Sequence, residues 1–129
     1  MSYSPFTQKV ITVLQSVPYG KVVSYGQVAV YIGVPRAARQ VGWTLRSIEE
    51  ENLIPWWRVV NNAGRISIDG NLHNDKPLQK KLLEQEGIEI KEDYTFDIEK
   101  YRFKAPIELL KKWELPENYR EVVLTKYGL

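Results

Sequence analysis

The stretch Val23–Ala29, VSYGQVA, decides the fold of this chain. Ser24 is followed three residues later by Gln27, which is the spacing of a capping box and predicts that a helix begins directly after Ser24. Apolar residues then recur at helical spacing, and Gly33 closes the helix. The sequence therefore predicts a short helix that ends just before a second conspicuous block.

That second block predicts another helix, from Pro35 to about Ile48. Proline is tolerated in the first turn of a helix, where its missing N–H would have no partner. Two helices joined by so short a link predict a helix-turn-helix whose second helix presents arginines outward. The residues suited to the core are Ala37, Ala38, Val41, Leu45 and Ile48, and the outward residues are Arg36, Arg39, Gln40, Trp43 and Arg46.

The other elements up to residue 90 follow from apolar spacing and breakers. Leu78, Leu82 and Leu83 are expected to be the buried residues of the last helix in this part. The predicted elements are a helix over Thr7–Val17, a loop at Glu49–Asn52, a short hairpin or wing formed by Val59–Val60 and Ile66–Ile68, and a helix capped by Asn74–Asp75, with Pro77 in its first turn, that ends at Gly87.

From about Lys91 the sequence changes character. The alternation of Tyr94, Phe96 and Ile98 predicts a strand, and Pro106–Trp113 predicts a short helix. Aromatic and apolar residues near the C-terminus indicate that this end is anchored too. Because no flexible linker is visible, we expect residues 1–90 to form a mostly α-helical domain and residues 91–129 a mixed α/β extension that packs on it.

The composition excludes several kinds of site. The chain has 129 residues, a formal net charge of +2 and no cysteine, so disulfides, thiolate metal sites and a cysteine nucleophile are excluded. A single histidine, His73, leaves no basis for a zinc or iron site, and we expect neither metal nor cofactor. No apolar run approaches the roughly 18 residues that span a bilayer, and no secretory signal is visible. We expect an intracellular protein, cytoplasmic and nucleoid-associated or nuclear according to its host.

Ile54–Val60, IPWWRVV, completes a set of three blocks with the two described above. In this order and spacing they resemble the C-terminal DNA-binding domain of the O6-alkylguanine-DNA alkyltransferases, over roughly Phe6–Ile90. The active-site signature of that family is Pro-Cys-His-Arg-Val. This chain has Trp56 at the cysteine position and Trp57 at the histidine position.

The replacement of both reactive residues removes the chemistry. Alkyl transfer needs a thiolate nucleophile and a nearby base that generates it. Indole supplies neither, because its nitrogen only donates a hydrogen bond. The chain therefore resembles the alkyltransferase-like proteins, which bind alkylated guanine in DNA without repairing it.

The resemblance implies a winged helix-turn-helix that enters the minor groove and rotates the target guanosine out of the stack. Arg39 matches the arginine that fills the hole left by the base, and Tyr25 matches the tyrosine that crowds the 3′ phosphate. Residue types alone also allow a solvated Arg39, or one paired with Glu49–Glu51, and a Tyr25 that serves only the core. Small side chains suit close approach to DNA or tight helix packing, and Arg36 and Arg46 suit phosphate contacts. The predicted DNA-binding residues are Tyr25, Arg36, Ala37, Ala38, Arg39, Gly42 and Arg46.

A lesion pocket is predicted around the two tryptophans. The resemblance places Trp56 against the flipped purine, although Trp56 and Trp57 would equally fill the volume of an inactive pocket. We expect Arg58 to brace the pocket from inside. Glu86 matches the glutamate that orients the family's histidine, and here we expect it to bond an indole N–H instead. The predicted pocket residues are Leu45, Trp56, Trp57, Arg58, Val59 and Val60.

Some positions depart from the family's pattern. Ile48 stands where the family has an asparagine, and Asp69 where its pocket loop carries tyrosine or arginine. Arg65 is a possible substitute from the wing. Trp43 is unusual for an outward position, and we expect the C-terminal extension to cover it rather than DNA.

The leading hypothesis is a monomeric, non-enzymatic DNA-damage sensor. It would bind O6-alkylguanine in double-stranded DNA and recruit nucleotide-excision-repair proteins. A helix-turn-helix regulator reading the major groove through outward residues of the 35–48 helix is the second hypothesis. A glycosylase using Asp69, Asp75 or Glu86 is the third. A protein-binding module built on the aromatic C-terminal extension is the fourth.

Overall fold

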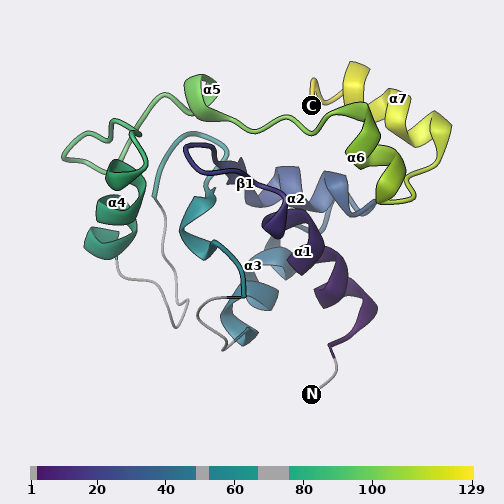
Figure 1. Cartoon of the computed structure of the whole chain (residues 1–129), viewed down its shortest axis with the longest axis horizontal. Helices are drawn as coiled ribbons and strands as arrows, with labels where there is room; N and C mark the ends of the chain where they lie inside the picture. The colour runs from purple at the N-terminus through teal and green to yellow at the C-terminus, as the bar shows by residue number, and fades with distance from the viewer. Residues whose placement is uncertain (1–2, 49–52, 67–75) are drawn as a thin grey trace.

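The computed structural model describes residues 3–48, 53–66 and 76–129. Over these residues the chain is mostly helical, as the sequence predicts (Figure 1). The elements are α1 (Pro5–Gln15), β1 (Val23–Ser24), α2 (Tyr25–Tyr31), α3 (Ala38–Ser47), the 3-10 turn η1 (Trp56–Arg58), β2 (Val59–Val60), α4 (Lys76–Gln85), α5 (Ile98–Tyr101), α6 (Ile107–Lys112) and α7 (Glu117–Thr125). None of the helices in the described ranges is long and apolar enough to cross a membrane.

The helix-turn-helix forms from local signals. Both halves of the capping box are present, since the hydroxyl of Ser24 accepts from the backbone N–H of Gln27 at 3.0 Å and the Gln27 amide oxygen accepts from Ser24 N–H at 3.3 Å. α2 ends at Tyr31 with Ile32 as its C-cap, and Gly33 follows with a φ of +87°. The Gly33 N–H is bonded to the Val30 carbonyl and the Val34 N–H to the Ala29 carbonyl. This pair of bonds is a Schellman motif, which satisfies the last carbonyls of α2.

The second helix begins later than predicted. Pro35 and Arg36 lie in a turn that the Ala37 N–H closes on the Val34 carbonyl at 2.9 Å. Because the chain must reverse after Gly33, these residues are used for the turn, and α3 begins at Ala38 with Ala37 as its N-cap. The prediction that proline occupies the first turn of this helix is wrong.

A small parallel sheet joins the Val23–Ala29 block to the Ile54–Val60 block. β1 pairs with β2 in parallel, with Val23 opposite Val59 and Ser24 opposite Val60. The predicted antiparallel turn exists only as the bridge between Asn61 and Arg65, and Ser67–Ile68 lie outside the described residues. The main partner of the second strand is therefore β1, which lies far away in the sequence.

The predicted strand over residues 94–98 is wrong. Only Thr95 forms a bridge, to Arg65, while Tyr94 has a φ of +67° and α5 begins at Ile98. The carboxylate of Asp93 accepts from both the N–H and the hydroxyl of Thr95, at 3.1 and 2.6 Å. Such a local side-chain bond favours a turn over an extended strand.

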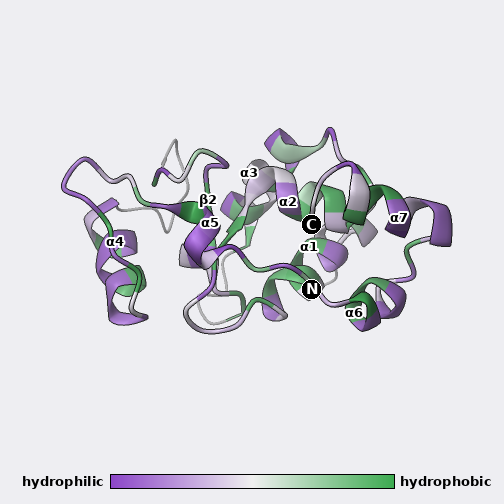
Figure 2. Cartoon of the chain, turned by 90° about the horizontal axis from the view of Figure 1, so that it is seen from above, coloured by the Kyte–Doolittle hydropathy of each residue, from purple (hydrophilic) through white to green (hydrophobic). Residues whose placement is uncertain are grey.

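α4 buries fewer leucines than predicted. Leu83 is fully buried, Leu82 is half-buried and Leu78 is exposed, so the prediction for Leu78 is wrong. Figure 2 shows α4 at one end of the molecule, with hydrophilic and hydrophobic residues in separate bands. A helix in such a position packs through one stripe only. The buried Gln79 lies on that stripe, and its amide donates to the carbonyls of Trp57 and Val59 at 3.0 Å each.

The residues after 91 share the main hydrophobic core. Buried side chains from this segment join the cluster formed by α1, α2 and α3, namely Phe103, Ala105, Leu110, Leu115 and Val123. The backbone of Phe103 and Tyr101 bonds to Val22 beside β1, and the Tyr119 hydroxyl donates to the Val30 carbonyl at 2.6 Å. In Figure 1 this segment crosses from α4 to α6 and α7, on the side of the molecule away from α3. The division at residue 90 stays a prediction.

Candidate nucleic-acid interface

α3 presents a basic outer side. Val41 and Leu45 are buried under the helix, whereas Arg39 is exposed and Arg46 half-exposed. Among the described residues, none forms an ion pair or hydrogen bond with Arg36, Arg39 or Arg46, and α3 itself contains no acidic residue. The alternative partners of Arg39, Glu49–Glu51, lie outside the described residues. Within the described part of the chain, these three guanidinium groups therefore have no anionic partner.

Trp43 lies uncovered on the same helix. Its exposed fraction is 54%, so the prediction that the C-terminal extension covers it is wrong. The physical reason is position, because the extension contacts α2 through Val30 and Tyr31 and runs on the side away from α3 (Figure 1).

Tyr25 is placed between the core and the surface. It is the first residue of α2, is half-buried, and packs against the main core cluster. A Cβ added at Gly42 would lie 3.9 Å from the Tyr25 ring, an ordinary van der Waals distance, so Gly42 of α3 faces this tyrosine and the site has room for a methyl group. Ala37 and Ala38 are also half-buried at the start of α3.

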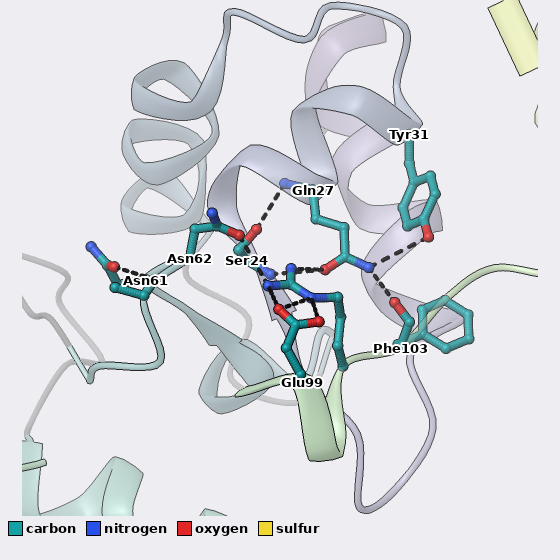
Figure 3. Close-up of polar contacts among 9 residues, drawn as sticks. Ser24, Gln27, Tyr31, Asn61, Asn62, Glu99 and Phe103 are labelled. Atoms are coloured by element: carbon teal, nitrogen blue, oxygen red, sulfur yellow. Dashed lines mark hydrogen bonds and ion pairs between the residues drawn. The ribbon is translucent and has the colours of Figure 1, made fainter. Parts of the chain in front are cut away.

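A polar network holds the N-terminus of α2, and the sequence analysis missed it. Figure 3 shows Gln27 turned toward Tyr31 and Phe103, with Asn62 and Glu99 nearby. The buried Gln27 amide donates to the Tyr31 hydroxyl and the Phe103 carbonyl. Arg102 then donates to the Gln27 amide oxygen and to Asn62, each at 3.1 Å, and pairs with Glu99 at 2.8 Å. A residue of the extension thus secures the helix that carries Tyr25.

The two tryptophans of IPWWRVV lie at η1. Trp56 is 8% exposed and meets Trp57 edge to face, with ring centroids 5.9 Å apart. Leu45, Trp56 and Val59 belong to the main core cluster, whereas Val60 belongs to a second cluster with Val22, Ile66, Leu83 and others. Neighbouring strand residues point to opposite faces, so the structure separates Val60 from Leu45, Trp56 and Val59, while Trp57 packs against both clusters.

Glu86 joins Trp57 and Arg58 in one buried cluster. Its carboxylate accepts from Trp57 Nε1 at 2.7 Å, from Arg58 Nη2 at 2.9 Å and from the Gly20 N–H at 2.8 Å. Arg58 Nη1 also donates to the Val17 carbonyl at 2.9 Å. The structure thus contains the indole bond expected of Glu86 and the internal bracing expected of Arg58.

The hydrogen bonds to Glu86 favour its ionised form. Burial alone would raise the pKa of Glu86, but the hydrogen bonds from Arg58, Gly20 and Trp57 together lower that pKa below its ordinary value. A carboxylate that stays ionised and fully bonded is unsuited to donating a proton, which argues against the glycosylase hypothesis at this residue. Asp69, His73 and Asp75 lie outside the described residues.

Comparisons with known proteins agree with this arrangement. The model of the 6-O-methylguanine DNA methyltransferase DNA-binding domain matches residues 5–88. Alkyltransferase-like protein 1 of Schizosaccharomyces pombe is 38% identical over 106 residues, which are 82% of this chain and 94% of that protein. The chain belongs to the alkyltransferase-like family.

One further relative and one solved structure extend the comparison. The DNA base-flipping protein of Escherichia coli is 40% identical over 98 residues, covering 76% of this chain and 74% of that protein. The crystal structure of S. pombe Atl1 in complex with damaged DNA containing O6-carboxymethylguanine matches with a TM-score of 0.72 and 37% identity, over 81% of this chain and 100% of Atl1. The family match runs from α1 through α4 and contains every predicted interface and pocket residue.

The chemistry of the catalytic relatives is excluded here. The chain contains no cysteine, so no sulfur nucleophile exists to accept an alkyl group. Within the described residues, no group of three or more His, Cys, Asp or Glu side chains is placed to hold a metal ion. The site consists of a basic helix, a tyrosine at its edge and two tryptophans in edge-to-face contact, of which Trp57 is hydrogen-bonded to Glu86.

Proposed function

We propose that this chain recognises O6-alkylguanine in double-stranded DNA by flipping the damaged nucleotide, and that it does so without chemistry. The observation that carries the proposal is Trp56, which stands where the resemblance places the reactive cysteine. Beside it, Trp57 contacts the Trp56 ring, and Trp57 and Arg58 both donate hydrogen bonds to Glu86. The proposal is also supported by relatives that are named for base flipping or were crystallised with alkylated DNA.

The described residues suggest how binding would work. α3 would approach the minor groove, where its arginines neutralise phosphates and release counterions. Arg39 would take the place of the departed base, since a planar cation can stack on neighbouring bases and bond the orphaned cytosine. Tyr25, at the edge of α2, would crowd the neighbouring phosphate.

Trp56 would supply the contact that distinguishes the lesion. Extrusion of a nucleotide costs a few kcal/mol, and contact between a base and an aromatic ring returns about 1–3 kcal/mol. Because indole is not a nucleophile, the base is held unchanged. We propose that the held lesion is passed on to nucleotide-excision-repair proteins and that the protein acts as a monomer inside the cell.

The test is a pair of duplexes that differ by a single O6-methylguanine. Wild-type protein is expected to bind the modified duplex more tightly, with the methyl group still present after incubation. Titration should quench tryptophan fluorescence, and the lesion preference should disappear in Trp56→Ala while binding to unmodified DNA remains. Equal affinity of the wild type for both duplexes would contradict the proposal. Enrichment of one defined sequence from a random duplex pool would indicate a regulator instead.

A further inference from the structure

Trp43 is the most exposed of the four tryptophans, at 54%. The others have aromatic neighbours: Trp56 and Trp57 contact each other, and Trp113 lies 5.4 Å from the ring of Tyr31. Within the described part of the chain, Trp43 has no ring contact, cation contact or hydrogen bond. Its indole N–H therefore has no protein acceptor there.

The charge around Trp43 identifies the kind of partner. Arg39, Trp43 and Arg46 are spaced by four and three residues, so they form one stripe on α3, opposite the buried Val41 and Leu45. The helix contains no carboxylate, and none of the described residues pairs with either arginine. A large aromatic side chain between two guanidinium groups that no described residue pairs is complementary to a polyanion that also offers apolar surface.

We propose that Trp43 binds the sugar–phosphate backbone of duplex DNA, with its ring on a deoxyribose and its N–H donating to a phosphate oxygen. The proposal rests on the proposed function, because that function makes DNA the partner of α3. The chemistry is matched, since indole is a donor only and phosphate oxygens are acceptors only. Ala38 and Gly42 lie beside the stripe and carry no long side chain that would hold the helix away from a DNA backbone.

A backbone contact makes a distinctive prediction. Backbone contacts carry no information about the base, so Trp43→Ala should weaken binding to modified and unmodified duplexes by the same factor, about five- to thirtyfold. Trp43→Phe keeps an aromatic ring but loses the N–H, so its affinity for DNA should lie between that of Trp43→Ala and that of the wild type. The dependence of affinity on salt should not change, because no charge is removed. Leu124→Ala, at an exposed apolar residue on α7, is the matched control and should bind like the wild type.

Fluorescence supplies a second readout. The difference between wild type and Trp43→Phe isolates the emission of Trp43, which acrylamide should quench in the free protein and not in the DNA complex. Unchanged affinity of a folded Trp43→Ala variant for the unmodified duplex would overturn the inference. So would a loss confined to the modified duplex, because that would place Trp43 at the lesion. Failure of the proposed function would instead appear as equal affinity of the wild type for both duplexes. In that case the affinity of Trp43→Ala for unmodified DNA would still show whether Trp43 contacts the backbone.

Discussion

Replacing Glu86 by glutamine should destabilise the fold by about 3 kcal/mol, and replacing it by alanine by up to about 5 kcal/mol. The Glu86 side chain is 5% exposed and that of Arg58 14%, and their ion pair measures 2.9 Å. Removing one partner of a buried pair leaves the other charge buried without compensation. Glutamine retains one acceptor oxygen for Trp57 or Gly20, so Glu86→Gln should destabilise the fold less than Glu86→Ala.

The effect should depend on pH in a definite direction. The folded-state pKa of Glu86 is lowered, so its stabilisation is fully present above the unfolded-state pKa and is lost as the pH falls through the folded-state value. The free-energy gap between wild type and Glu86→Gln should therefore be constant near neutrality and shrink below about pH 4.

Urea unfolding at pH 7 and at acidic pH measures this gap directly. Glu99→Gln is the matched control, because Glu99 pairs with Arg102 at 2.8 Å while its own side chain is 66% exposed. Such an exposed carboxylate should contribute less than about 1 kcal/mol. The reasoning is refuted if Glu86→Gln costs no more than Glu99→Gln, or if its cost is the same at both pH values.

Three further predictions concern residues that hold the extension to the fold. Gly64→Ala should lower the free energy of unfolding, measured by thermal unfolding, by more than about 2 kcal/mol. The φ of Gly64 is +80°, and the new Cβ would overlap the backbone oxygen of Phe96. Tyr119→Phe should lower the free energy of unfolding by about 1 kcal/mol, because it removes the hydrogen bond to the Val30 carbonyl. Burial, with a smaller effect from Tyr127, raises the pKa of Tyr119 to about 12. Ultraviolet titration of Tyr119→Phe should therefore match that of the wild type below about pH 11. Arg102→Ala should cost about 1.5–3 kcal/mol by removing a charged donor from the buried glutamine of the capping box, with partial rescue by Arg102→Lys; equal unfolding curves for the three proteins would contradict this.

Signals that act over three or four residues were readable from the sequence. Ser24 and Gln27 predicted the start of α2, and Gly33 predicted its end. The pairing of Val23 with Val59 was not readable, because strand runs close in sequence favour a hairpin and nothing local marks a partner 36 residues away. The position of Pro35 was misjudged because the reversal after Gly33 needs more chain than a single link residue provides.

Buried polar side chains were the hardest to predict from residue types. Gln79 and Arg102 belong to residue types that are mostly exposed. Gln79 is buried here, and the Arg102 side chain is 7% exposed, because carbonyl, amide or carboxylate acceptors surround them. A signal existed for Gln79, which precedes the buried Leu83 by four residues and so shares its face of α4. None existed for Arg102, whose acceptor groups come from α2, from the turn after β2 and from α5.

The cluster around Glu86 explains how catalytic residues can be lost without loss of the fold. The resemblance to the alkyltransferases implies a glutamate that orients a histidine, and in this chain the same carboxylate accepts from the indole N–H of Trp57 at 2.7 Å. Indole reproduces the donor of an imidazole but not its basicity, so the bond is kept while proton transfer is not. Because Glu86 also accepts from Arg58 and Gly20, we expect the carboxylate to stabilise the fold whether or not a nucleophile stands beside it. The bonds of Glu86 account for its presence without any catalytic role, so the glutamate is no sign of enzymatic activity.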